Sequence, residues 1–346
     1  MLGAIVGDIV GSVYEFNNIK TTEFELFCAK SRFTDDTVMT LAVAWWLTAD
    51  ETHSPDRLVE CMRELGHRYP DAGYGYHFKR WIFSKNPAPY GSWGNGSGMR
   101  VSPVGLYAAT LDEALALAEI SASVTHDHPE GIKGAQAVAA CMYMCRTGNT
   151  KEEIKSYIEK TFGYDLNRKL DDIRPGYTFD VSCQGSVPEA IMAFLEGRSF
   201  EETIRLAVSI GGDSDTIACM AGAMASCLYS IPMDIAGKCD DVLTDDLREI
   251  KDEFLNMVSA RNGLRDRFLR MFHFFIYAAL VYVFSANVLF TPFSHPLYAS
   301  SRSSSARSFS TDGFCRLISS NCSRLVRTFA CSCRSARRMF SVIPLL

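Results

Sequence analysis

Apolar residues recur with helical spacing along roughly the first 260 residues of this 346-residue chain, and polar, glycine-rich segments separate these runs. Residues 37–48 are apolar nearly all round, as in a helix at the centre of a bundle. Residues 111–123 are rich in strong helix formers, residues 217–228 are small and apolar, and residues 246–259 predict an amphipathic closing helix. Neither alternating strands nor a repeat of about 20–50 residues is evident. The pattern predicts an all-α, single compact multi-helix domain.

Two helix starts have the spacing of a capping box, in which a hydroxyl and a glutamate three residues later satisfy each other's backbone N–H groups. The pairs are Thr150 with Glu153 and Ser199 with Glu202. Each is expected to open an amphipathic helix.

The N-terminal segment carries glycines at a four-residue spacing, at Gly3, Gly7 and Gly11, which predicts a small-residue stripe and tight helix packing. Its two acids, Asp8 and Glu15, are seven residues apart and are expected on one helix face. An acid at the end of such an apolar helix is a candidate general acid or base with a raised pKa. A solvent-exposed Glu15 without a role is the alternative.

Two acidic clusters, Thr34-Asp-Asp-Thr37 and Gly211-Gly-Asp-Ser-Asp-Thr216, precede apolar helical runs. Carboxylates and hydroxyls form an all-oxygen ligand set, which hard cations such as Mg²⁺, Mn²⁺ or Ca²⁺ prefer. The alternative is that each cluster only caps its helix. Because both clusters lead into apolar helices, where an unneutralised acidic patch would be costly, a shared cation site is favoured.

The segment Tyr90 to Arg100 holds four glycines between positions 91 and 98. Glycine backbone can approach a ligand closely and present N–H groups to phosphate, although this segment lacks the lysine of a P-loop. Thr125 to Glu130 precedes another predicted helix, whose N-terminus could hold an anion. A flexible loop and surface or capping histidines are the alternatives.

Charge divides the chain near residue 264. Residues 1–264 carry 24 basic and 38 acidic residues, whereas residues 265–346 carry 11 Arg, no Lys and two Asp. The acidic body argues against a nucleic-acid surface. The eight cysteines of the body lack a CxxC pair or zinc spacing and predict free thiols of a reducing compartment: Cys28, Cys61, Cys141, Cys145, Cys183, Cys219, Cys227 and Cys239. With no basic stretch before the first apolar run, we expect a cytoplasmic protein.

The C-terminal part, residues 263–346, is basic and rich in Ser, Arg and Cys. It contains an apolar segment, residues 271–290, about long enough to cross a bilayer. Arginines on both sides of that segment give no clear membrane orientation. Three interpretations are open: the product of a shifted reading frame, a membrane anchor or a disordered extension. We assign the functional domain to residues 1–262.

The order of motifs over residues 1 to about 260 resembles the ADP-ribosylglycohydrolase family, which includes dinitrogenase-reductase-activating glycohydrolase and the ADP-ribosyl-arginine and ADP-ribosyl-serine hydrolases. The motifs are Gly7-Asp-x-x-Gly-Ser-x-x-Glu15, Thr34-Asp-Asp-Thr37, Gly94-Asn-Gly-Ser-Gly-Met-Arg-Val-Ser-Pro103, Thr125-His126 with Gly134-Ala135, Ser186-Val-Pro-Glu-Ala-Ile191 and Gly211-Gly-Asp-Ser-Asp-Thr216. Six motifs in one order are far more specific than any of them alone.

The resemblance implies an all-α fold with two Mg²⁺ or Mn²⁺ ions per site. It places metal ligands at Thr34, Asp35, Asp36, Asp213, Asp215 and Thr216. It places the catalytic glutamate at Glu15, with Asp36 as the other candidate for proton transfer. It places ADP-ribose contacts at Gly94, Asn95, Gly96, Ser97, Gly98, Met99 and His126. The implied reaction removes ADP-ribose from modified protein side chains or other conjugates by cleavage at the ribose anomeric carbon, through an oxocarbenium-like state.

Two other functions remain at this stage. A non-catalytic ADP-ribose-binding or crystallin-like structural protein would keep the fold without needing Glu15 and all six ligands. An HD-type phosphohydrolase would use His126-Asp127 with His53, His67 or His77, and would leave both acidic clusters unexplained. The expected partner is an ADP-ribosylated protein or small-molecule conjugate, with membrane contact only through residues 271–290, and the expected state is a monomer.

Overall fold

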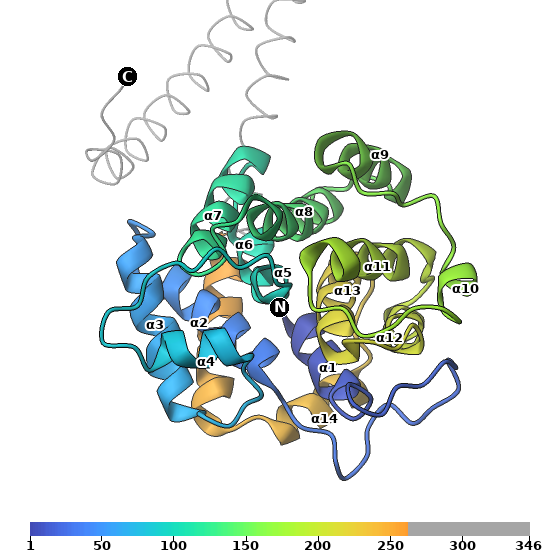
Figure 1. Ribbon diagram of the computed structural model, residues 1–346, viewed down its shortest axis with the longest axis horizontal. Helices are drawn as coiled ribbons and strands as arrows, with labels where there is room; N and C mark the ends of the chain where they lie inside the picture. The colour runs from blue at the N-terminus through green and yellow to red at the C-terminus, as the bar shows by residue number, and fades with distance from the viewer. Residues whose placement is uncertain (262–346) are drawn as a thin grey trace, which may run out of the picture. The chain divides into compact units, whose positions relative to one another are not determined.

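The computed structural model of the protein describes residues 1–261, which are helical and contain no β-strand (Figure 1). Fourteen helices of this part are labelled α1 to α14, and a further helical segment at 245–261 follows them. The labelled helices are α1 (Leu2–Gly11), α2 (Asp35–Ala49), α3 (Pro55–Arg68), α4 (Tyr76–Ile82), α5 (Gly96–Met99), α6 (Ser102–Tyr107), α7 (Leu111–Ser123), α8 (Pro129–Arg146), α9 (Lys151–Phe162), α10 (Leu170–Ile173), α11 (Cys183–Glu196), α12 (Phe200–Ser209), α13 (Ser214–Leu228) and α14 (Met233–Val242). The predicted all-α fold is confirmed.

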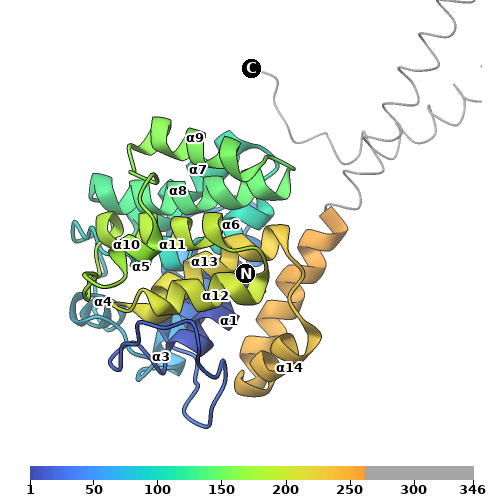
Figure 2. The ribbon, with the colours of Figure 1, turned by 90° about the vertical axis from the view of Figure 1, so that its right-hand side faces the viewer.

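Helices α1 and α13 lie side by side and form the most extensive helix pair of the described residues (Figures 1 and 2). The glycine stripe makes this approach possible. A Cβ atom on Gly3 would lie 2.1 Å from the carbonyl oxygen of Gly222, and one on Gly7 would lie 2.0 Å from that of Ala218. The predicted tight packing of both helices is therefore confirmed, and it brings the end of α1 to the start of α13.

Around this pair, α13 also packs against α11 and α12, while α1 packs against α2. Helix α2 is buried continuously from Asp36 to Ala44, as the all-round apolar pattern predicted. Helix α7 spans the predicted residues, and the buried face of α8 contacts α5, α6, α7 and α11. The acidic clusters are thus attached to the most extensively packed helices of the described residues.

The predicted capping box is complete at the start of α9 and only half formed at the start of α12. Thr150 and Glu153 form the reciprocal capping box of α9. Ser199 accepts a hydrogen bond from the N–H of Glu202, but the Glu202 carboxylate accepts from the N–H of Arg198 instead of that of Ser199. The eight cysteines of the described residues are free thiols; Cys28 is exposed and six of the others are buried.

One prediction about α1 is wrong: Glu15 does not share a helix face with Asp8. Helix α1 ends at Gly11, and the Ser12 hydroxyl donates back to the carbonyl of Ile9. The Asn18 side-chain amide then donates hydrogen bonds of 2.8 Å to the carbonyl oxygens of Tyr14 and Glu15. In a continuing helix these oxygens would have accepted hydrogen bonds from backbone N–H groups four residues later. The chain therefore turns, and Glu15 reaches the site from a loop.

No helix among residues 1–261 is long and apolar enough to cross a bilayer. The apolar segment 271–290, and all of residues 263–346 about which three interpretations were open, lie outside the described residues.

Candidate metal and ADP-ribose site

The two acidic clusters meet at the ends of three helices. Thr216 at the start of α13 donates a hydrogen bond of 3.1 Å from its hydroxyl to the Asp36 carboxylate at the start of α2, across 180 positions of sequence. Helix α1 holds both starts together, because a Cβ on Gly11 would lie only 2.4 Å from the Cα of Asp215. The clusters predicted from sequence therefore form one site.

Two groups of carboxylates in this site have oxygen atoms close enough to hold an ion. Asp8, Asp36 and Asp215 form one group, and Glu15, Asp213 and Asp215 form the other, with the candidate ligand atoms of each group within 4.8 Å of one another. Asp215 belongs to both groups. Two adjoining all-oxygen positions are the arrangement that a pair of hard divalent cations requires.

Asp8 has a role that the sequence did not reveal. Its carboxylate accepts hydrogen bonds from the N–H and hydroxyl groups of Thr34, at 2.9 and 2.7 Å, and from the N–H and hydroxyl groups of Thr37. Both of its oxygens accept hydrogen bonds from residues at the start of α2, so Asp8 anchors this start against α1. The only signal was its place beside Gly7 in the first motif, because nothing local links it to residues 34–37.

The site carboxylates strongly favour protonation or a cation. Burial raises the pKa of Asp36 well above its ordinary value, and the charges of Asp8 and Asp35 raise it further. The same causes, burial first and then the charge of Asp213, raise the pKa of Asp215. Among the described residues Asp36 Oδ1 is buried without a hydrogen-bond partner. A buried, unpaired carboxylate oxygen in an all-oxygen site fits a divalent cation.

Asp35 belongs to neither close group. Its backbone N–H donates to the carbonyl of Ala72, and the residue as a whole is half-buried. Burial of the carboxyl group and then the charges of Asp8 and Asp213 raise its pKa well above the ordinary value. Asp35 therefore lies within electrostatic reach of the site.

Hydrogen bonds from the Asn18 side chain fix the position of the turn that carries Glu15. Besides bonding to the Tyr14 and Glu15 carbonyls, the Asn18 amide donates to the Gly212 carbonyl at 2.9 Å, and its oxygen accepts from the Gly212 N–H at 2.6 Å. Gly211 and Gly212 both adopt left-handed backbone, with φ of 75° and 70°, which favours glycine strongly. Asn18, which sequence reasoning missed, ties the turn that carries Glu15 to the segment that carries Asp213.

The Glu15 carboxyl is partly buried beside other acids. Burial raises its pKa from 4.5 to about 7, and the charge of Asp213 contributes in the same direction. A pKa near neutrality allows a carboxyl group either to donate or to accept a proton at physiological pH. The exposed, functionless Glu15 considered above is therefore less consistent with the geometry.

The glycine-rich segment adjoins the acidic site. Asn95 donates a hydrogen bond of 2.7 Å to the Asp213 carboxylate, and the segment is partly ordered as the short helix α5. Ser97 donates to the carbonyl of Gly131 at 2.7 Å, whereas Gly98 lies against Met220. Met99 uses its carbonyl to accept from Thr40. The segment is thus held by the core, and it is not the flexible loop of the alternative interpretation.

His126 faces this segment and is kept neutral. Burial and the charge of Arg100 lower its pKa well below the ordinary value. Arg100 donates to the Thr125 hydroxyl at 2.8 Å, so that hydroxyl directs its own hydrogen to His126 Nδ1, 2.7 Å away. This network assigns the ring hydrogen to Nε2, the atom 3.2 Å from a Cβ built on Gly96. Fully buried Arg100 was missed because its function depends on contacts with α7 and Thr125.

Neither a pair of simple helix caps nor an HD-type phosphohydrolase site accounts for the geometry of residues 1–261. Thr34 does cap α2, but Asp213 makes no side-chain capping bond at α13. The carboxylate groups that could hold an ion contain no histidine among residues 1–261. His53, His67 and His77 pack instead against aromatic rings, and Asp127 accepts the N–H of Gly91. An HD-type site is not assembled within residues 1–261.

The fold and site define a class: all-helical proteins with an acidic, all-oxygen centre where helix ends meet. A family model described as ADP-ribosylglycohydrolase matches residues 1–263, and the chain belongs to this family. It is therefore an ADP-ribosyl hydrolase, an enzyme that cleaves a glycosidic bond to release ADP-ribose.

Several relatives extend this result. ADP-ribosylhydrolase ARH3 of Mus musculus is 26% identical over 338 residues, covering 73% of this chain and 91% of that protein. ADP-ribosylarginine hydrolase Tri1 of Pseudomonas putida is 25% identical over 266 residues, covering 67% of this chain and 70% of that protein. A solved structure titled ADP-ribosylglycohydrolase-related protein complex superposes with a TM-score of 0.56 at 25% identity, covering 75% of this chain and 96% of that one.

Proposed function

We propose that this hydrolase depends on two Mg²⁺ or Mn²⁺ ions held by Thr34, Asp35, Asp36, Asp213, Asp215 and Thr216. The observation that carries the proposal is the meeting of Asp36 and Thr216 beside the unpaired oxygen Asp36 Oδ1. Divalent cations bound there would supply positive charge that orients the ribose hydroxyls and offsets the charge of the carboxylates. Asp8 would keep Thr34 in place through its two hydrogen bonds.

We assign proton transfer at the anomeric carbon to Glu15, with Asp36 as the second candidate. Glu15 belongs to one of the two carboxylate groups and lies on a turn fixed by Asn18, and its pKa of about 7 suits either direction of transfer. In glycoside hydrolysis, such a carboxyl group protonates the leaving atom or takes the proton of the attacking water. Neutral His126 and the N–H groups of residues 94–99 would hold the rest of ADP-ribose.

The substrate is proposed to be an ADP-ribosylated protein side chain or another ADP-ribosyl conjugate. The relatives differ on this point, since one is named for arginine linkages and the others carry no linkage in their names. The hydrolase is assigned to residues 1–262, which contain every residue of the site.

A panel of ADP-ribosylated substrates assayed with Mg²⁺ and with Mn²⁺ tests this proposal. Release of free ADP-ribose is expected, and excess chelator is expected to abolish it. Asp36→Asn and Asp215→Asn should lose metal affinity and activity together, whereas Asp234→Asn, at an exposed position of α14, should keep both. Full activity of both site variants, or in chelator, would exclude the metal centre. ADP-ribose binding without release from any substrate would indicate a non-catalytic binder.

A further inference from the structure

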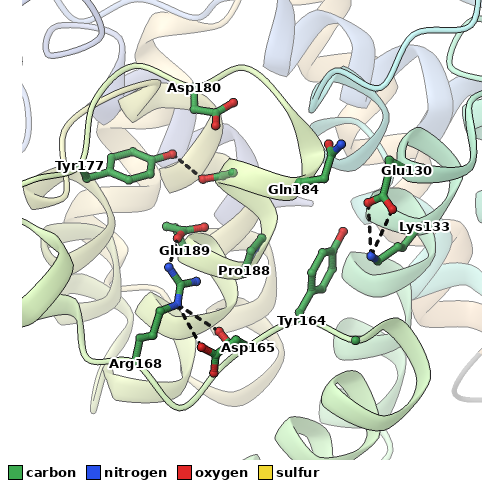
Figure 3. Close-up of a pocket in the computed structure, with 12 residues that line it drawn as sticks. Glu130, Lys133, Tyr164, Asp165, Arg168, Tyr177, Asp180, Gln184, Pro188 and Glu189 are labelled. Carbon is green, nitrogen blue, oxygen red and sulfur yellow. Dashed lines mark hydrogen bonds and ion pairs between the residues drawn. The ribbon is translucent and has the colours of Figure 1, made fainter.

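A polar pocket of about 550 Å³, separate from the metal and ADP-ribose site, lies between the first turns of α8, the N-terminal half of α11 and the loop after α9 (Figure 3). Its walls contain none of the residues assigned to the metal and ADP-ribose site. The lining residues used below are Glu130, Lys133, Tyr164, Arg168, Gln184 and Glu189.

The cationic side chains of this pocket already have anionic partners. Lys133 Nζ lies 3.2 Å from a carboxylate oxygen of Glu130 and 4.6 Å from the ring centroid of Tyr164. Arg168 donates to Glu189 Oε1 at 2.8 Å and lies 3.8 Å from Asp165. Asp180 also lines the pocket, so its acidic residues outnumber its basic ones. The electrostatic balance favours a positively charged occupant.

Three buried polar atoms in the walls have no hydrogen-bond partner among residues 1–261, and one of them, Glu130 Oε2, belongs to the ion pair with Lys133. Glu189 is only 3% exposed and Tyr164 only 6%, yet neither Glu189 Oε2 nor the Tyr164 hydroxyl has a hydrogen-bond partner among residues 1–261. Figure 3 shows the Tyr164 hydroxyl directed into the space between Gln184 and Glu130. An unpaired buried polar group destabilises a folded protein, so such atoms commonly mark the place of a missing partner.

The wall of α11 contributes a further acceptor. Pro188 lies inside this helix and has no N–H to donate to the carbonyl of Gln184, four residues earlier. Gly185, the next residue, accepts a hydrogen bond from the Tyr177 hydroxyl at 2.6 Å. The Gln184 carbonyl therefore lacks its usual helical N–H partner, which adds an acceptor to the unpaired Glu189 Oε2.

We infer that this pocket binds an organic cation carrying a guanidinium or primary ammonium group. Glu189 Oε2 accepts from the cation, and the Tyr164 hydroxyl and the Gln184 carbonyl offer the further acceptors. A metal ion does not suit the pocket, because its acids form no close ligand group among the described residues. The occupant is either a free amine or the basic side chain of a polypeptide.

This pocket adjoins the metal and ADP-ribose site through one residue. The Tyr177 ring packs against Gly212, where a built Cβ would lie 2.5 Å from Cε1, and Gly212 precedes Asp213. The Tyr177 hydroxyl meanwhile bonds to Gly185 in the pocket wall. The inference itself does not depend on metal or ADP-ribose binding.

Calorimetric titration of the full chain with N-acetyl-arginine amide tests the inference. The matched uncharged probe is N-acetyl-citrulline amide, which has nearly the same shape, and its affinity should be at least about tenfold lower. Agmatine and a short arginine-containing peptide distinguish the two sources. Tighter binding of agmatine indicates a free amine, and tighter binding of the peptide indicates a polypeptide side chain.

Two variants localise the binding. Glu189→Gln should weaken the arginine probe at least about tenfold, and Tyr164→Phe, which removes only the hydroxyl, should weaken it severalfold while keeping the thermal unfolding profile. Glu152→Gln, at an exposed position of α9, is the control and should bind normally. The absence of binding at millimolar probe, equal binding of the citrulline probe, or undiminished binding by folded Glu189→Gln and Tyr164→Phe would each overturn the inference.

Discussion

Gly7 lets α1 and α13 touch backbone to backbone, and an alanine at this position tests how far the fold depends on that contact. A Cβ on Gly7 would lie 2.0 Å from the carbonyl oxygen of Ala218 and 2.6 Å from the N–H nitrogen of Cys219. Real Cβ atoms essentially never come within 3.0 Å of such atoms. Because the obstructing atoms are backbone, no side chain can rotate away, and the two helices must move apart.

The cost follows from that separation. Overpacking a close-packed core typically costs about 1–3 kcal/mol, and a clash between two helix backbones belongs at or above the upper end. Alanine is favoured over glycine in a helix interior by about 1 kcal/mol, which offsets part of this cost. We expect Gly7→Ala to lower the free energy of unfolding by about 2 kcal/mol or more. For a domain of this size, that lowers Tm by about 4–8 °C.

Thermal unfolding followed by circular dichroism measures the effect, with Gly237→Ala as the matched control. Gly237 lies within α14, and a Cβ there would have nothing within 4 Å. This substitution should raise Tm by about 2–4 °C, because only the helix preference changes. If Gly7→Ala unfolds at or above the wild-type temperature, the close approach of α1 and α13 is wrong. An equal decrease of Tm in Gly7→Ala and Gly237→Ala would also contradict this explanation, because the Gly237 variant creates no clash.

Three further predictions concern the acidic site. Glu15→Gln is expected to keep the fold, metal affinity and ADP-ribose affinity while single-turnover rates fall by about 10² to 10⁴; turnover within a few-fold of wild type would make Glu15 structural. In chelator, the stability that the raised pKa of Glu15 gives is fully present below the ordinary pKa of 4.5 and is lost as pH rises to about 7, so wild type should gain Tm relative to Glu15→Gln as pH falls from about 7 to about 5. A constant difference in Tm would contradict the raised pKa. Asn18→Ala should lower turnover by misplacing Glu15, because the side chain bonds to both the Glu15 carbonyl and Gly212. Metal affinity measured alongside should change much less, and unchanged turnover would show that the Asn18 hydrogen bonds are dispensable.

The helices were predictable because their determinants are local. Apolar periodicity, helix propensity and capping residues act within a turn or two, so residues 111–123 could be assigned to α7 and Thr150 to a helix start. The glycine stripe likewise predicted a close helix neighbour without identifying it. The order of short motifs indicated the family, since each motif is a local arrangement of residues with a special conformation or charge.

The arrangement of the site was decided by tertiary packing. Asp36 and Thr216 come into hydrogen-bond contact across 180 positions only because α1 packs against both of their helices. The same packing gives Asp8 its threonine partners, and the early end of α1 places Glu15 on a turn instead of a helix face. No local property of the chain determines these contacts, because they depend on the relative positions of helices that are distant in sequence.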